Sequence, residues 1–190
     1  NASEQMMSTD WIVMTWGTSY VYLHGETHLV VGNCHKQPER MFERKRLGVP
    51  DIVEDFKNVL YAIRRMNPKL KVLLTVSPIR HAKDGMHGNQ LSKSTLLLAA
   101  DEICQTCSDC FYFPSYEIMM DELRDYRFYA DDMFHPSHMA IDYIWECFSR
   151  CYFSKETQSV MNEWMEIKKS IAHQPFRPES EAYQRFLSQI

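Results

Sequence analysis

Three short apolar segments, separated by helical patterns, most constrain how this chain can fold. They are Trp11 to Trp16, Lys71 to Val76 and Cys110 to Phe113, and each is rich in strand-forming residues and followed by glycine, serine or proline. Strands that alternate with helices are joined by right-handed crossovers and form a parallel sheet covered by helices. The sequence therefore predicts an α/β fold with a mostly parallel sheet.

Helical periodicity fills the spaces between and after these strands. One helix is expected to begin at Pro50 and to end before Pro68, and a second is expected to begin with Ser92 as its N-cap. Ser137 is a further N-cap candidate, because an amphipathic pattern follows it. Two more helical segments are expected, at residues 154–173 and 179–188.

The region after the first strand predicts an antiparallel hairpin. Tyr20 to Leu23 and Leu29 to Val31 are the arms, and the turn between them contains Gly25. Charged residues dominate from Gln37 to Gly48, and we interpret that segment as a solvated connection to the next helix.

Polar residues follow each predicted strand of the parallel sheet. They are Gly17 to Ser19 after the first strand, Ser77 to His81 after the second and Pro114 to Glu117 after the third. Ligands of open parallel sheets bind beyond the carboxyl ends of the strands. We expect a functional site on this rim, and we expect the loop from Asp132 to His135 to reach the same edge.

The loop from Asp132 to His135 carries the strongest chemical signal. The carboxyl and imidazole groups are three residues apart, and Pro136 fixes the backbone directly after the histidine. A carboxylate held against a ring nitrogen orients the imidazole and stabilises its protonated form, which makes the histidine a usable general base. The alternative is a turn whose Asp, Pro and Ser serve turn chemistry alone.

A cationic loop containing Arg80, His81 and Lys83 follows the second strand. Such a loop suits a carboxylate, a phosphate or an acidic sugar, although a solvated loop has the same composition. Ser77 and Cys34 are alternative nucleophiles, but Ser77 lacks a glycine-rich elbow around it and Cys34 has only an adjacent histidine.

No metal or other cofactor is expected. The run Cys104, Cys107 and Cys110 could begin a zinc or iron–sulfur site, but no clear fourth ligand is nearby. His81 and His87 with Asp84 match no defensible ligand spacing.

Composition limits the remaining function classes. A chain of 190 residues with 45% hydrophobic content has room for one domain with a core. A net charge of -4 argues against a nucleic-acid partner, and no apolar run reaches the roughly 20 residues that membrane insertion needs. Six cysteines without a secretion signal favour a reducing, cytoplasmic compartment, and the oligomeric state stays open.

Several long stretches resemble one known family. They are TWGTSYVY (15–22), GNCHK (32–36), TVSPIRHAKDG (75–85), LSKSTLLLA (91–99), YFPSYEIMMDELRDYRFYADDMFHPS (112–137) and HQPFRP (173–178). Together they resemble the GSCFA domain family, a chiefly bacterial group similar to SGNH/GDSL hydrolases. The resemblance spans nearly the whole chain.

The resemblance implies a three-layer α/β/α sandwich that acts on acyl esters. It implies an SGNH-like domain at residues 1–153 and a helical extension at 154–190 packed on the same domain. Carried onto this sequence, it makes His135 the base and Asp132 its acid partner. The resemblance also makes Gly17 and Asn33 candidates for oxyanion stabilisation. We expect Thr18, His35, Arg80 and His81 to contact the substrate.

One departure from the family pattern changes the expectation. No glycine-serine-cysteine-phenylalanine-alanine motif occurs in these 190 residues, so the serine nucleophile and the first strand are expected upstream of Asn1. The resulting hypothesis is a serine ester hydrolase acting on a small-molecule or carbohydrate ester, such as O-acylated carbohydrate. The alternative is a non-catalytic domain that binds an anionic glycan or peptide through Arg80, His81 and Lys36.

Overall fold

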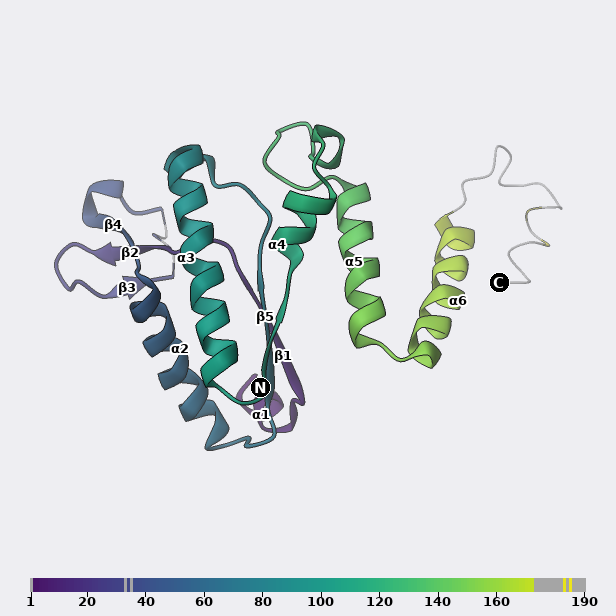
Figure 1. The fold of residues 1–190 in the computed structure, drawn as a ribbon, viewed down its shortest axis with the longest axis horizontal. Helices are drawn as coiled ribbons and strands as arrows, with labels where there is room; N and C mark the ends of the chain where they lie inside the picture. The colour runs from purple at the N-terminus through teal and green to yellow at the C-terminus, as the bar shows by residue number, and fades with distance from the viewer. Residues whose placement is uncertain (1, 33, 35, 173–182, 184, 186–190) are drawn as a thin grey trace. The chain divides into compact units, whose positions relative to one another are not determined.

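Over the residues that the structure describes, the protein forms a parallel and an antiparallel sheet, each of three strands (Figure 1). The computed structural model describes residues 2–32, 34, 36–172, 183 and 185, which divide into one compact unit at residues 1–144 and another at 145–190. The parallel sheet has the order β1-β5-β6, from β1 (Trp11–Trp16), β5 (Lys71–Val76) and β6 (Cys110–Phe113). The predicted α/β class and all three predicted strands are confirmed.

The main core lies between this sheet and two long helices. Helices α2 (Val49–Arg64) and α3 (Gly85–Thr106) lie on one side of the sheet (Figure 1). Leu74 of the central strand is fully buried, and such a side chain contributes about 1.5–3 kcal/mol by leaving water. The buried side chains that pack with it are Ile52, Val53, Leu60, Val72, Val76, Leu96, Ala99, Ala100, Ile103, Cys110 and Tyr116.

The opposite face of the sheet is covered by the segment that follows β6. This segment forms α4 (Ser115–Glu117), which continues into the π-helical turn η3 (Ile118–Glu122) on the far side of the sheet from α3 (Figure 1). Ser115 Oγ lies 2.5 Å from Thr75 Oγ1, and Met119 is fully buried. Helical cover on both faces makes the fold an α/β sandwich.

The antiparallel sheet has the order β3-β2-β4, from β2 (Tyr20–His24), β3 (Val30–Val31) and β4 (Phe42–Arg46). The predicted hairpin is confirmed, because Tyr22 pairs with Val31. Most of residues 37–48 are exposed, as the interpretation of a solvated segment expects, but the segment is more than a connection. A short turn, η1 (Glu39–Met41), leads into β4, and β4 pairs along β2.

Arg44 explains why a charged segment forms a strand. Its guanidinium lies 4.9 Å from the ring centres of both Tyr20 and Tyr22, and it donates two hydrogen bonds of 2.9 Å to the carboxylate of Asp84. The Asp84 side chain is buried, so this bidentate pair attaches the antiparallel sheet to the start of α3.

The predicted start of α3 is wrong. Ser92 is not an N-cap, because the helix begins at Gly85, directly after the short turn η2 (Ala82–Asp84). Ser92 instead lies buried within the helix, where its hydroxyl is used by the loop after β1.

The remaining helices lie near the two chain ends. At the amino end, α1 (Ala2–Ser8) is held by Asn67, whose side-chain amide donates to the carbonyls of Met6 and Thr9. Helix α5 (His138–Tyr152) begins as predicted, since Ser137 Oγ accepts the N–H of Ala140. Helix α6 (Lys155–Ala172) matches the next prediction, and the expected helix at residues 179–188 lies outside the described residues.

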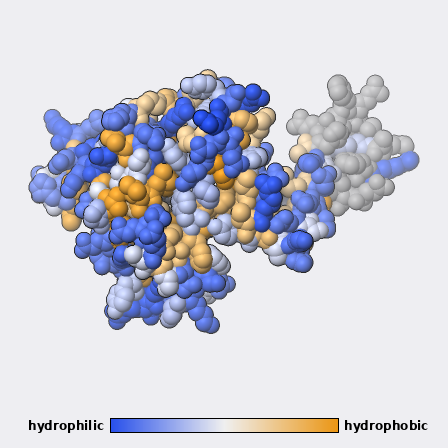
Figure 2. All heavy atoms as spheres, in the orientation of Figure 1, coloured by the Kyte–Doolittle hydropathy of each residue, from blue (hydrophilic) through white to orange (hydrophobic). Residues whose placement is uncertain are grey.

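The visible face of the first unit is largely hydrophilic, with apolar side chains exposed in small groups (Figure 2). Scattered apolar residues are ordinary on protein surfaces. In the part of the chain that the structure describes, no helix combines the length and the hydrophobicity that crossing a bilayer requires.

Candidate active site

The loop that carries Asp132 and His135 is a short two-stranded ribbon. Tyr129 pairs antiparallel with Pro136, and the N–H of Ala130 donates to the carbonyl of His135 at 2.8 Å. Met133 lies at the tip with a φ of 61°, a left-handed conformation that few non-glycine residues adopt. The ribbon is thus closed by backbone hydrogen bonds, and it holds the acid and the histidine in fixed register.

Asp132 contacts the imidazole of His135 directly. Oδ2 of Asp132 lies 2.5 Å from Nδ1 of His135, while Oδ1 accepts the backbone N–H groups of Phe134 at 2.8 Å and His135 at 2.9 Å. The His135 side chain is 59% exposed, so the ring stays accessible. This geometry supports the predicted pairing of a carboxylate with a base.

The same hydrogen bonds determine how the Asp132 carboxyl titrates. The N–H of His135, the N–H of Phe134 and the His135 ring lower the pKa of Asp132 to about 2. A carboxyl with a pKa depressed on folding stabilises the fold above its ordinary pKa near 3.8, and that contribution is lost as pH falls through about 2. We therefore expect an NMR titration of the Asp132 carboxyl carbon to have its midpoint near pH 2, and a midpoint near 4 would contradict the pairing.

Arg80 connects the strand β5 rim to this ribbon. Its backbone N–H donates to the carbonyl of Phe134, and its guanidinium donates to the Tyr129 hydroxyl at 2.8 Å and to the carbonyl of Met133 at 3.3 Å. The guanidinium also lies 4.0 Å from the centre of the Tyr129 ring. Arg80 therefore positions the ribbon, and its predicted contact with substrate stays a prediction.

A second cluster forms where β1 ends. The Ser92 hydroxyl accepts the N–H of Ser19 at 2.7 Å and lies 3.0 Å from the hydroxyl of Thr18. Thr18 Oγ1 also accepts the N–H of Tyr20. The loop that begins at Gly17 is thus fixed to α3, which gives the preorganised backbone that an oxyanion site requires.

Lys93 stabilises the same rim from inside the protein. Its side chain is fully buried, and Nζ donates to the carbonyl oxygens of Gly17 and Ser77, both at 2.6 Å. Burial lowers the pKa of Lys93 to about 8. One ammonium group therefore links the carboxyl ends of β1 and β5.

His81 lies beside Gly17. Its backbone N–H donates to the side chain of Asn89 at 2.9 Å, and a side chain at position 17 would approach Nε2 of His81 to 3.4 Å. Nε2 is buried and has no hydrogen-bond partner in the structure. Burial, followed by the nearby charge of Lys93, lowers the pKa of His81, so the ring is neutral at pH 7.

The predicted site residues therefore fall into two groups joined by the adjacent residues Arg80 and His81. One group contains Asp132 and His135, and the other contains Gly17 and Thr18. The predicted roles of Asn33 and His35 lie outside the described residues. The alternative nucleophile Ser77 is buried, and its hydroxyl accepts the N–H of Ile79 in a turn.

The three cysteines considered for a metal site are free thiols. Over the described ranges, no group of three or more His, Cys, Asp or Glu side chains could hold a metal ion.

Two family sequence models match this chain. The sequence model of the GSCFA family matches residues 1–148, which include both groups of the site. The chain belongs to the GSCFA family. A second model, described as the C-terminal domain of GSCFA domain proteins, matches residues 164–190. No curated protein matches the chain.

Three residues that hold the loops after β1 and β5 in this GSCFA chain were not predicted as part of the site. Asn89, Ser92 and Lys93 are buried on α3, and they continue the face that carries Leu96 and Ala100 one and two turns later. Polar residues on the buried face of a helix need hydrogen-bond partners. The helical spacing of Asn89, Ser92 and Lys93 with the apolar residues that follow was therefore the sequence signal that could have identified them.

Proposed function

We propose that this GSCFA chain contributes the base and the oxyanion rim of an SGNH-type serine ester hydrolase. The observation that carries the proposal is the contact between Asp132 Oδ2 and His135 Nδ1, in a loop where Asp132 also accepts two backbone N–H groups. Three hydrogen bonds to one carboxylate are more than turn formation requires, and they fix the ring of an exposed histidine.

The tautomer of His135 follows from this contact. A carboxylate can only accept a hydrogen bond, so Nδ1 of His135 carries the hydrogen that it donates to Asp132, and the lone pair lies on Nε2. In the proposed reaction Nε2 takes the proton of a serine hydroxyl as the oxygen attacks the ester carbonyl. It then gives that proton to the departing alkoxide, and Asp132 stabilises the intermediate imidazolium. In the second half of the reaction Nε2 takes a proton from water as the water attacks the acyl-serine, and it returns that proton to the serine oxygen as the carboxylic acid leaves.

The nucleophile in this proposal is the serine of a glycine-serine-cysteine motif, which these 190 residues do not contain. Gly17 supplies a backbone N–H to the oxyanion, and Asn33 supplies its side-chain amide. The attachment of this loop to Ser92 and Lys93 supports the role of Gly17.

A hollow beside Gly17 offers space for the acyl group of the ester. It has a volume of about 250 Å³ and is lined by Thr15, Trp16, Gly17, Thr18, Ser19, Leu47, Ile52 and Leu96. The apolar side chains among these residues suit an acyl chain. O-acylated carbohydrate as the alcohol partner rests on the family resemblance alone.

A cytoplasmic location is part of the same proposal, and the six free thiols support it.

The proposal is tested by comparing two neighbouring aspartates in the full-length protein. In Asp132→Asn, we expect turnover of p-nitrophenyl acetate to fall about 10⁴-fold, because an amide does not hold the Nδ1–H tautomer. Asp131→Asn is the matched control, since it makes the same chemical change one residue earlier, and it should keep activity within about twofold.

Equal activity in the two variants would contradict the assigned role of Asp132. Binding of an acidic glycan by the full-length protein, without ester hydrolysis, would instead favour the non-catalytic alternative.

A further inference from the structure

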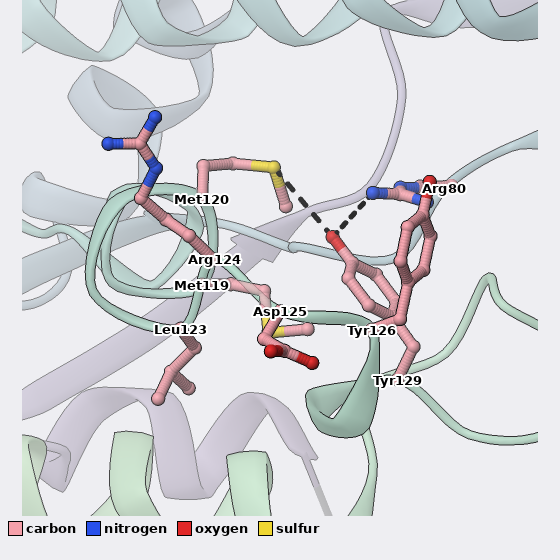
Figure 3. Close-up of a pocket in the computed structure, with 8 residues that line it drawn as sticks. All are labelled: Arg80, Met119, Met120, Leu123, Arg124, Asp125, Tyr126 and Tyr129. Carbon is pink, nitrogen blue, oxygen red and sulfur yellow. Dashed lines mark hydrogen bonds between the residues drawn. The ribbon is translucent and has the colours of Figure 1, made fainter.

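A second cavity lies beside the loop that carries the candidate base (Figure 3). It has a volume of about 240 Å³ and is formed by the turns η3 and η4 (Tyr126–Phe128) together with the loop after β5. The residues that line it are Arg80, Met119, Met120, Leu123, Arg124, Asp125, Tyr126 and Tyr129. All of them belong to the first compact unit.

The cavity lies beside the ribbon, and neither Asp132 nor His135 is among the residues that line it. Tyr129 lines the cavity, as its stick drawing shows (Figure 3). A molecule in this cavity is therefore distinct from an ester attacked beside His135.

The inner wall of this cavity is formed by flexible apolar side chains, and its rim is polar. Met119 and Leu123 are buried, and Met120 lies between Arg124 and Arg80 in the view of Figure 3. The Tyr129 hydroxyl contacts both Arg80 and the sulfur of Met120. Methionine side chains adapt to irregular apolar and aromatic groups.

The charge at the rim favours an anion. Arg80 and Arg124 contribute two positive charges, and the carboxylate of Asp125, which also lines the cavity, is paired with Arg127 at 3.0 Å. That ion pair holds the pKa of Asp125 below its ordinary value, and it leaves an excess of positive charge around the cavity. Arg80 uses two of its five N–H donors on Tyr129 and Met133, so donors remain for an incoming carboxylate.

We propose that this cavity binds a small organic carboxylate with an aromatic or branched apolar body. The volume is below the roughly 300 Å³ at which pockets for drug-sized ligands begin, so the occupant has on the order of ten non-hydrogen atoms. The carboxylate is held by Arg80, Arg124 adds positive charge on the other side of Met120, and the apolar body lies against Met119 and Met120. Such a ligand contacts Arg80. Because Arg80 also donates hydrogen bonds to the carbonyls of Met133 and Phe134, ligand binding is coupled to the ribbon that carries His135.

Methionine methyl NMR tests this site without relying on enzymatic activity. The chain contains 12 methionines, and their ¹³C-labelled methyl signals can be assigned by single Met→Leu substitutions. On titration with phenylacetate, we expect saturable shifts of the Met119 and Met120 signals, with Met66 on the α2 side unchanged. Arg124→Gln should weaken binding about three- to fivefold, because it removes one exposed charge, whereas Arg65→Gln, an exposed arginine at the end of α2, should not change it.

The uncharged analogue phenylacetamide separates charge recognition from apolar filling, and it should bind more weakly than phenylacetate. The proposal is overturned if Met119 and Met120 show no saturable shift, or if phenylacetamide shifts them as effectively as phenylacetate. Failure of the ester hydrolase proposal would leave this result unaffected.

Discussion

His135→Ala is expected to abolish ester hydrolysis by the full-length protein. Loss of the base from a serine triad costs on the order of 10⁵- to 10⁶-fold in turnover, because the serine hydroxyl is no longer deprotonated as it attacks. The His135 side chain is largely exposed, so the fold should survive the change. Turnover of p-nitrophenyl acetate and the far-ultraviolet circular dichroism spectrum are the two measurements.

His138→Ala is the matched control. His138 is an exposed residue at the start of α5, three positions after His135, and it lies outside the candidate site. It should retain activity within about twofold. A folded His135→Ala variant that keeps wild-type turnover would remove His135 from the mechanism.

Lys93→Met is expected to have the largest effect on stability. The substitution keeps an unbranched side chain of similar length, but it leaves the carbonyls of Gly17 and Ser77 without the ammonium that bonds to both at 2.6 Å. Buried acceptors without a partner cost about 1–3 kcal/mol each, so the loss of both bonds should lower the free energy of unfolding by roughly 2–6 kcal/mol. Urea denaturation at pH 7 measures the change.

The pH dependence of this loss identifies Lys93 as its source. Because folding lowers the pKa of Lys93 from 10.5 to about 8, the unfolded chain binds more protons between these values, and the contribution of Lys93 to stability rises with pH there. The difference between wild type and Lys93→Met should therefore be larger at pH 10 than at pH 7. Lys69→Met, at an exposed position, should show neither the loss nor this trend. An unchanged midpoint in Lys93→Met would show that the two carbonyls do not need the ammonium.

The parallel sheet could be predicted from sequence because its strands are short continuous apolar runs. Leu73 and Leu74 are both buried, since helical segments cover both faces of the sheet, and this produces an uninterrupted run instead of an alternating one. Strand β4 could not be predicted in the same way. Its pairing with β2 depends on Arg44 contacting Asp84, which lies 40 residues away, and no local pattern encodes that contact.

In the candidate site, too, contacts between residues close in sequence could be predicted, and contacts between distant residues could not. Asp132 and His135 are three residues apart, so local chemistry was enough to predict their contact. The roles of Ser92 and Lys93 depend on the loop after β1, more than 70 residues earlier in the chain. Ser92 was interpreted as a helix cap because serine favours that position, and the tertiary contact with Ser19 took precedence over this local preference.

The most direct test of the proposed chemistry is the labelling of the full-length protein by a fluorophosphonate, followed by intact-mass measurement. This reagent forms a stable adduct with a serine that a neighbouring base activates. The wild-type protein should acquire one adduct, on a serine, and His135→Ala should acquire it at least about 10³-fold more slowly. Labelling at the same rate in both proteins, or no labelling of the wild type, would contradict the assignment of His135 and Asp132 as the base and its partner.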